Sequence, residues 1–231
     1  PGLGLAALPL RSPGDLFFDM EGDPFVEGGG LEYLFGITEV VDGAPRFHAF
    51  WAHDRAAEKT AFEALVDLVI ERLDRHPNLH VYHYAAYEAT ALKKLMGRHA
   101  TREQEDDRLL RGGVLVDLYQ VVRQGMWVSK ESYSLKSLEA YYMPKRDEAI
   151  ADAASSIVAY EEWLRSGKLR LLNDIERYNE RDCESTRLLR DWLEARRTEL
   201  ELRMGRALAR PERRSGAAQP AANAVRWPAV R

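Results

Sequence analysis

The chain has 231 residues, of which 45% are hydrophobic and 30% charged, with a formal net charge of −4 at pH 7. This length suits one fairly large domain with tails, and the acidic balance argues against a protein that captures nucleic acid by charge alone. The single cysteine, Cys183, excludes an internal disulfide framework. No apolar run is long enough to cross a membrane and no signal segment is evident, so we expect a cytoplasmic protein without a membrane partner.

The predicted elements begin, after a linker over residues 1–14, with a meander of three strands. The turn residues Asp42 and Gly43 separate the second strand from the third, which is typical of a β-hairpin. The pattern then changes, because apolar residues recur at the spacing of an amphipathic helix. The strands and helices predicted up to this point are 16–20, 33–41, 46–51, 56–73, 79–84 and 87–99.

The second half of the chain is predicted to be mostly helical. Thr101 and Gln104 form a capping-box pattern for a helix through residue 110. The apolar run 114–118 predicts a further strand, with continuation of this segment into a helix as an open alternative. Helical patterns follow at 133–142, 157–164 and 171–202. This order predicts an α/β domain with a mixed central sheet, including an antiparallel hairpin meander, flanked by helices.

Two acidic residues, Asp19 and Glu21, stand at the end of the first predicted strand. With one residue between them, both side chains point to the same face of that strand. Two like charges there are costly unless a cation lies between them, and a divalent metal meets that need. The alternative is a pair of surface acids in a loop.

Near the other end of the predicted domain, Tyr178 and Asp182 are four residues apart in a helical pattern and share one helix face. Asp182 falls on the same stripe as Leu189 and Leu193, so it is expected to point inward toward the sheet. The two acidic motifs together predict two-metal hydrolysis of phosphodiester bonds. For Tyr178, a purely structural role in the core is the alternative.

Four motifs follow one another along the chain, at residues 17–25, 83–88, 133–136 and 178–182. They resemble the DEDD exonuclease superfamily of ribonuclease H-like enzymes in its tyrosine-bearing subclass. More closely, they are similar to the RNase H-like domain of bacterial RecB-like nuclease/helicase proteins. The subclass with a catalytic histidine would have it at position 177, where this chain has Arg177. The resemblance covers residues 3–195 and implies the ribonuclease H-like fold, with the first strand central and the last helix beside it.

The second acidic motif departs from the superfamily pattern, which typically has an aspartate after the fourth strand. Here Glu88 stands at about that place. A glutamate reaches one methylene further and still offers oxygen ligands to a metal. Asp117, at the end of an apolar run, is the alternative, and His83 is expected to be structural or to contact substrate.

The resemblance implies a 3′–5′ exonuclease acting on single-stranded DNA or RNA, with DNA favoured, in a protein of DNA processing and repair. Two Mg²⁺ or Mn²⁺ ions would be bound by Asp19, Glu21, Glu88 and Asp182, while Tyr178 orients the attacking water. The residues expected to contact nucleic acid are Lys130, Tyr133 and Lys136.

The implied RNase H-like nuclease domain covers residues 15–198. Residues 199–231 are an Arg-rich tail, expected to lead to a further domain, with helicase and other nuclease domains of the same polypeptide as partners. One alternative is a catalytically inactive RNase H-like module that binds nucleic acid or has a structural role in a larger helicase. Another is an endonuclease acting on branched or RNA-containing duplexes.

Overall fold

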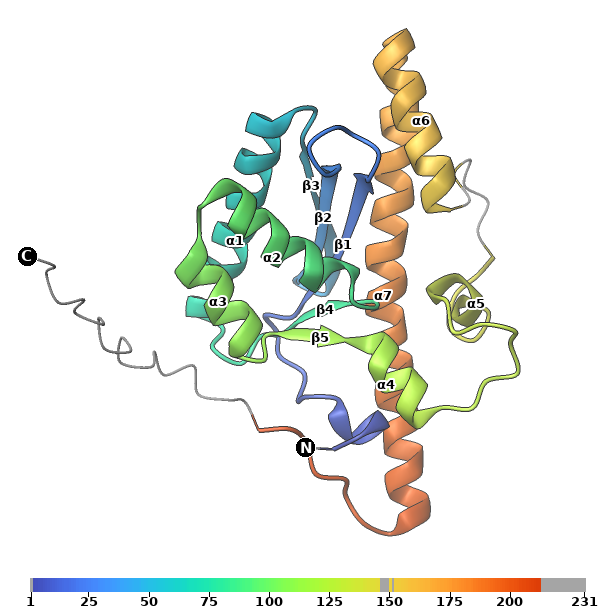
Figure 1. The fold of residues 1–231 in the computed structure, drawn as a ribbon. Helices are drawn as coiled ribbons and strands as arrows, with labels where there is room; N and C mark the ends of the chain where they lie inside the picture. Colours follow the sequence, from blue (N-terminus) through green and yellow to red (C-terminus); the bar gives the residue numbers. More distant parts are fainter. Residues whose placement is uncertain (1, 146–149, 151, 213–231) are drawn as a thin grey trace, which may run out of the picture.

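The computed structural model describes residues 2–145, 150 and 152–212. Its centre is a five-stranded sheet in the order β3-β2-β1-β4-β5 (Figure 1). The first three strands are antiparallel neighbours, and β4 and β5 run parallel to β1. The strands are β1 (Leu16–Asp23), β2 (Leu31–Val41), β3 (Ala44–Trp51), β4 (Val81–His83) and β5 (Leu115–Asp117).

Helices cover both faces of this sheet. Three of them, α1, α2 and α3, pack on one face, and the long helix α7 crosses the other (Figure 1). The shorter helices α4, α5 and α6 lie beside α7. The helices are α1 (Arg55–Arg75), α2 (Tyr87–His99), α3 (Glu103–Arg111), α4 (Leu118–Gly125), α5 (Leu135–Glu139), α6 (Ala153–Ser166) and α7 (Leu169–Met204).

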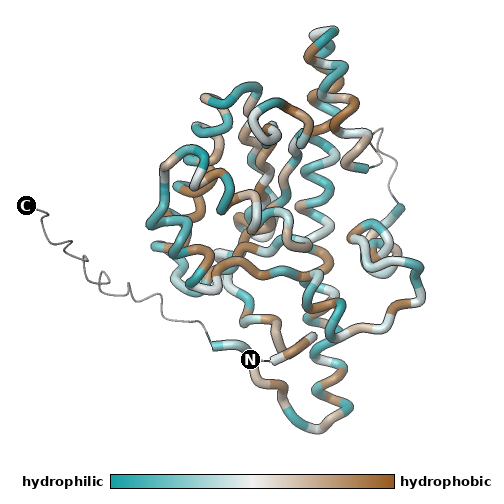
Figure 2. The backbone as a smooth tube through the Cα atoms, in the orientation of Figure 1, coloured by the Kyte–Doolittle hydropathy of each residue, from teal (hydrophilic) through white to brown (hydrophobic). Residues whose placement is uncertain are grey.

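The alternation of side chains along β1 assigns its residues to the two faces. Phe18 and Met20 join the hydrophobic cluster under α1, α2 and α3, whereas Phe17 packs with Leu189 of α7. Figure 2 shows hydrophobic stretches of the backbone gathered along the central strands. Because successive residues of a strand point to opposite faces, the odd-numbered positions that follow Phe17 face α7.

The predicted α/β fold class is confirmed, including the antiparallel meander and the flanking helices. Some elements differ in extent. The strand predicted at 79–84 is shorter, and the helix predicted at 133–142 is reduced to α5. Helix α4 follows β5 without a loop, because the Asp117 carboxylate accepts a hydrogen bond from the Tyr119 backbone N–H and caps the helix.

Both terminal segments of the described chain contact the C-terminal half of α7. Arg197 is almost completely buried and donates hydrogen bonds to the carbonyl oxygens of Leu5 and Leu208. Leu5 belongs to a short 3-10 helix, η1 (Gly4–Ala7), and Leu8 is fully buried in the cluster beneath α7. Residues that read as linker in the sequence therefore take part in the packed structure.

Candidate metal centre

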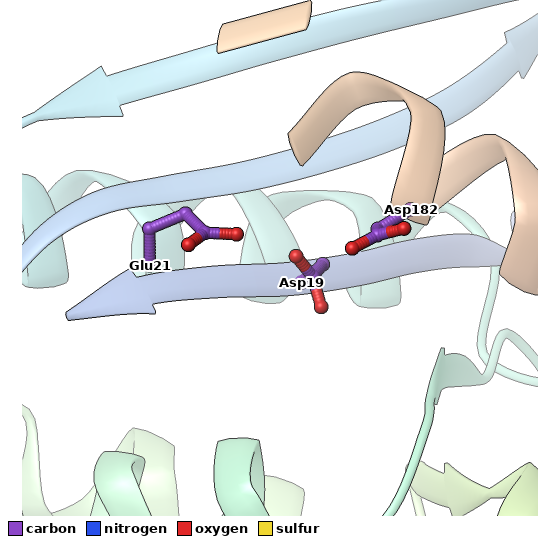
Figure 3. Close-up of side chains that lie close together, drawn as sticks. All are labelled: Asp19, Glu21 and Asp182. Carbon is purple, nitrogen blue, oxygen red and sulfur yellow. The ribbon is translucent and has the colours of Figure 1, made fainter. Parts of the chain in front are cut away.

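Three carboxylates meet between the central strand and the long helix. Asp19 and Glu21 come from β1, and Asp182 comes from α7. One carboxylate oxygen of each lies within 4.8 Å of the others, and Figure 3 shows the three side chains gathered on one side of β1. Glu21 and Asp182 are buried and Asp19 is partly buried. Residues near opposite ends of the described chain thus form one acidic group.

The close approach of α7 to the sheet depends on a glycine in the neighbouring strand. Gly36 of β2 pairs with Asp19 in the strand register. A Cβ atom added to Gly36 would lie 1.6 Å from Asn179 Oδ1, so a larger residue would have to displace the Asn179 side chain. Cys183 of α7 also donates its thiol hydrogen to the Gly36 carbonyl oxygen, at 3.3 Å. Gly36 therefore leaves the space in which the Asn179 side chain reaches Asp19.

Two further polar side chains hold the carboxylates in place. Asn179 is fully buried, and its Nδ2 donates a hydrogen bond to Asp19 Oδ2 at 2.7 Å. Ser156 of α6, also fully buried, hydrogen-bonds to Glu21 and lies 2.7 Å from the Tyr33 hydroxyl. Neither residue was predicted from the sequence as part of the site. The sequence spacing could have indicated Asn179, because it is three positions before Asp182 and shares its helix face. No sequence pattern indicates Ser156.

The electrostatics of the site fit a bound cation. Burial raises the pKa of Glu21 to about 8; the hydrogen bond from Ser156 opposes this rise and the charge of Asp182 adds to it. Crowded carboxylates repel one another, and a divalent ion removes both the repulsion and the cost of burying negative charge. Carboxylate oxygens are the hard ligands that Mg²⁺ and Mn²⁺ prefer. The residues present therefore fit such an ion.

Tyr178 lies at the edge of the acidic group. Its side chain is 3% exposed, and its hydroxyl oxygen accepts a hydrogen bond from Lys136 Nζ at 2.6 Å. Burial raises the pKa of the Tyr178 phenol, and the charges of Asp182 and Glu21 raise it further. The hydroxyl is therefore protonated at physiological pH and serves as a neutral hydrogen-bonding group.

Glu88 stands outside the group of three. It lies in the first turn of α2, is 3% exposed, and has its carboxylate 3.3 Å from His83 Nδ1. Burial raises the pKa of Glu88, while the hydrogen bond with His83 lowers it. Asp117 has a structural role, because one of its carboxylate oxygens accepts hydrogen bonds from the backbone N–H groups of Ala85 and Tyr119, each at 2.9 Å. Its position fixes the backbone around β4 and β5.

The three residues expected to contact nucleic acid are not equally placed. Lys136 reaches the acidic site through Tyr178, whereas Lys130 is exposed, with its ammonium 5.8 Å from the centre of the Tyr141 ring. Tyr133 is half-buried and donates its hydroxyl hydrogen to the Met126 carbonyl oxygen at 3.1 Å. Of the three, Lys136 alone has a contact at the site.

Comparison with known proteins gives a match to a family model. A model described as the RNase_H superfamily matches residues 16–194, which is more than half of the chain. No curated protein and no solved structure gives a significant match. Among the helices in the described part of the chain, none combines the length and apolar character needed to cross a membrane.

Proposed function

The chain belongs to the RNase H superfamily, and we propose that it is a divalent-metal-dependent nuclease, acting as a 3′–5′ exonuclease on single-stranded nucleic acid. The superfamily generally hydrolyses nucleic acids, which supports the nuclease class. The observation that carries the metal-dependent chemistry is the group formed by Asp19, Glu21 and Asp182, whose oxygens lie within 4.8 Å of one another. DNA is the favoured substrate, within a nuclease/helicase protein of DNA processing.

In this proposal, Asp19, Glu21 and Asp182 hold Mg²⁺ or Mn²⁺, and Glu88 contributes from α2 to a second ion. When bound, the metal supplies Lewis-acid activation of water and charge stabilisation at the phosphate. Asn179 keeps the Asp19 carboxylate in a fixed orientation through its 2.7 Å hydrogen bond. The protonated hydroxyl of Tyr178 orients the attacking water beside the carboxylates.

The proposal is tested with a 5′-labelled single-stranded oligonucleotide incubated with Mn²⁺ or Mg²⁺. We expect a ladder of shortened products from the wild type. Asp19→Asn and Asp182→Asn should each slow cleavage at least about 100-fold, because each removes a charged ligand. Glu180→Gln is the matched control, because Glu180 is an exposed acid two positions from Asp182 on the same helix. Its rate should equal that of the wild type.

Comparing linear with circular substrates distinguishes an exonuclease from an endonuclease. Circular single-stranded DNA has no end, so cleavage of circles would contradict the exonuclease and favour an endonuclease. Matched DNA and RNA strands measure the sugar preference. Absence of cleavage on every substrate, with metal present, would contradict the proposed hydrolytic activity.

A second candidate is a catalytically inactive module that binds nucleic acid within a larger helicase. The position of Glu88 favours it, because this carboxylate lies against His83 rather than with the other three acids. That candidate predicts that Asp19→Asn leaves the affinity for single-stranded DNA unchanged while no cleavage occurs in either protein. Fluorescence anisotropy with a labelled oligonucleotide measures this affinity.

A further inference from the structure

Lys136 makes two contacts with one side chain of the site. Its Nζ donates a hydrogen bond to the Tyr178 hydroxyl oxygen at 2.6 Å and lies 4.5 Å from the centre of the Tyr178 ring. The ammonium group therefore lies at the hydroxyl end of the ring. A hydrogen bond combined with a cation–π contact restricts both the position of the oxygen and the rotation of its hydroxyl hydrogen.

The segment that carries Lys136 is fixed to the rest of the protein. Ser134 caps α5, because its Oγ accepts a hydrogen bond from the Ser137 backbone N–H. Leu138 is fully buried in the cluster that contains Leu189 of α7. After the helix, the Tyr142 hydroxyl lies 3.0 Å from Ser185 Oγ, also on α7.

Tyr84, at the end of β4, donates its hydroxyl hydrogen to the Tyr133 carbonyl oxygen just before α5. The segment is thus attached at both of its ends. Lys136 is half-buried, and its backbone has a fixed position relative to Tyr178. A side chain held in this way is suited to fixing the position of Tyr178. It is less suited to binding a phosphate group of the substrate.

We propose that Lys136 is a positioning residue: it holds the Tyr178 hydroxyl in the orientation that directs the attacking water and does not itself bind the substrate. This inference rests on the proposed function. The hydroxyl also donates a hydrogen bond to Asp182. With Lys136 donating to the same oxygen, the hydroxyl is held from two sides.

Steady-state cleavage of a single-stranded oligonucleotide separates positioning from substrate binding. Lys136→Met should lower kcat about 10- to 100-fold, the usual effect of removing a group that orients a catalytic side chain, with KM unchanged within about threefold. Lys136→Arg, which retains a donor and a charge, should recover part of the loss. Lys168→Met is the control, because Lys168 is an exposed lysine directly before α7; its kcat should be that of the wild type.

A double-mutant cycle with Tyr178→Phe tests whether Lys136 acts through the tyrosine. In the Tyr178→Phe background, Lys136→Met should cost less than about threefold in kcat, because the group it positions is already absent. Two losses that multiply would overturn the proposal. A raised KM with an unchanged kcat would also overturn it, and would assign Lys136 to the substrate phosphates instead.

Nuclear magnetic resonance of the Tyr178 ring tests its contact with Lys136 without requiring cleavage, so it is independent of the proposed function. In protein with isotope-labelled tyrosine rings, the Tyr178 resonances are identified by their loss in Tyr178→Phe. Lys136→Met should shift them and Lys168→Met should not; unshifted resonances in Lys136→Met would overturn the contact. A wild type that cleaves no substrate would contradict the proposed function and the positioning role, while the resonance shift would still report the contact itself.

Discussion

Asn179 is the residue on which the geometry of the acidic site depends most closely. It is fully buried, it donates to Asp19, and it occupies the space that Gly36 leaves open. Asn179→Ala should weaken Mn²⁺ binding about 10- to 100-fold, because the Asp19 carboxylate loses the group that orients it. It should also lower the free energy of unfolding by about 1–3 kcal/mol, through the loss of a hydrogen bond to a charged group.

Electron paramagnetic resonance of free Mn²⁺ measures the affinity, and urea denaturation measures the stability. Asn173→Ala is the matched control, because Asn173 is an exposed asparagine on the same helix. Equal Mn²⁺ affinities in the two variants would show that Asn179 does not orient the Asp19 carboxylate.

Asp106 of α3 should make the free energy of unfolding depend on pH, independently of the candidate metal centre. It is fully buried, and neither carboxylate oxygen has a hydrogen-bond partner among the residues that the structure describes. Burial, and then the charge of Asp107, raise the pKa of Asp106 to about 6. The folded state therefore binds the proton more tightly than the unfolded state does, so the ionised carboxylate destabilises the fold above pH 6 and this cost disappears as the pH falls toward 4.

Asp106→Asn should accordingly raise the free energy of unfolding by about 1–3 kcal/mol at pH 8 and by much less at pH 4.5. Urea denaturation at the two pH values measures the difference. Asp107→Asn, which alters the neighbouring and exposed acid, should change stability by less than about 0.5 kcal/mol. A gain for Asp106→Asn that is equal at both pH values would contradict this account.

The sequence placed Asp19, Glu21 and Asp182 together, as the structure does, but it also assigned Glu88 to this group and did not indicate which residues support the acids. Asp19 and Glu21 could be paired by strand alternation, and Asp182 could be placed on the inner face of its helix by its leucine stripe. Glu88 could be placed after β4, yet its contact with His83 depends on the path of the chain between them, which no local pattern specifies. The hydrogen bond of Ser156 depends likewise on where α6 packs.

At the scale of elements, one buried carboxylate joins the helical layer to strand β2 of the sheet. Glu58 of α1 is fully buried and accepts hydrogen bonds from Arg98 and His99 of α2, from Arg55, and from the Glu32 backbone N–H of β2. Glu58→Ala should destabilise the protein by about 1–3 kcal/mol, because it leaves the largely buried Arg98 and the Glu32 backbone N–H without their hydrogen-bond partner.

The control for this prediction is an ion pair at the surface of the same helical layer, between α1 and the residue that precedes α3. Arg102 and Asp67 form two hydrogen bonds at the surface, and Asp67→Asn should cost no more than about 1 kcal/mol. Urea denaturation of both variants measures the two costs. Equal losses would mean that Glu58 is not the connection between α1, α2 and β2.

Element boundaries were predictable where the local pattern is strong. The meander, α1 and α7 could be predicted because apolar periodicity and the Asp42-Gly43 turn act over neighbouring residues. A helix directly after the strand at 114–118 was an open alternative in the sequence, and the start of α4 at Leu118 depends on Asp117 as a cap. The short α5 also owes its limits to tertiary contacts, with Leu138 buried against α7.

At the scale of the whole molecule, the site lies where the two layers of the fold meet. The central strand supplies two acids, and α7 crosses the sheet close enough to supply the third (Figure 1, Figure 3). A sheet surface flanked by one long helix provides a rigid base, because its carboxylates are set by strand register and helix packing rather than by loops. This arrangement explains how acids of distant sequence reach the spacing that a divalent ion requires.

The most direct test of the account is a calorimetric titration of Mn²⁺ into the wild type, Asp182→Asn and Glu180→Gln. We predict that the wild type and Glu180→Gln bind the ion with equal affinity and that Asp182→Asn binds it at least about tenfold more weakly, because one of three charged ligands is lost. Equal affinities for all three proteins would contradict a metal site formed by Asp19, Glu21 and Asp182.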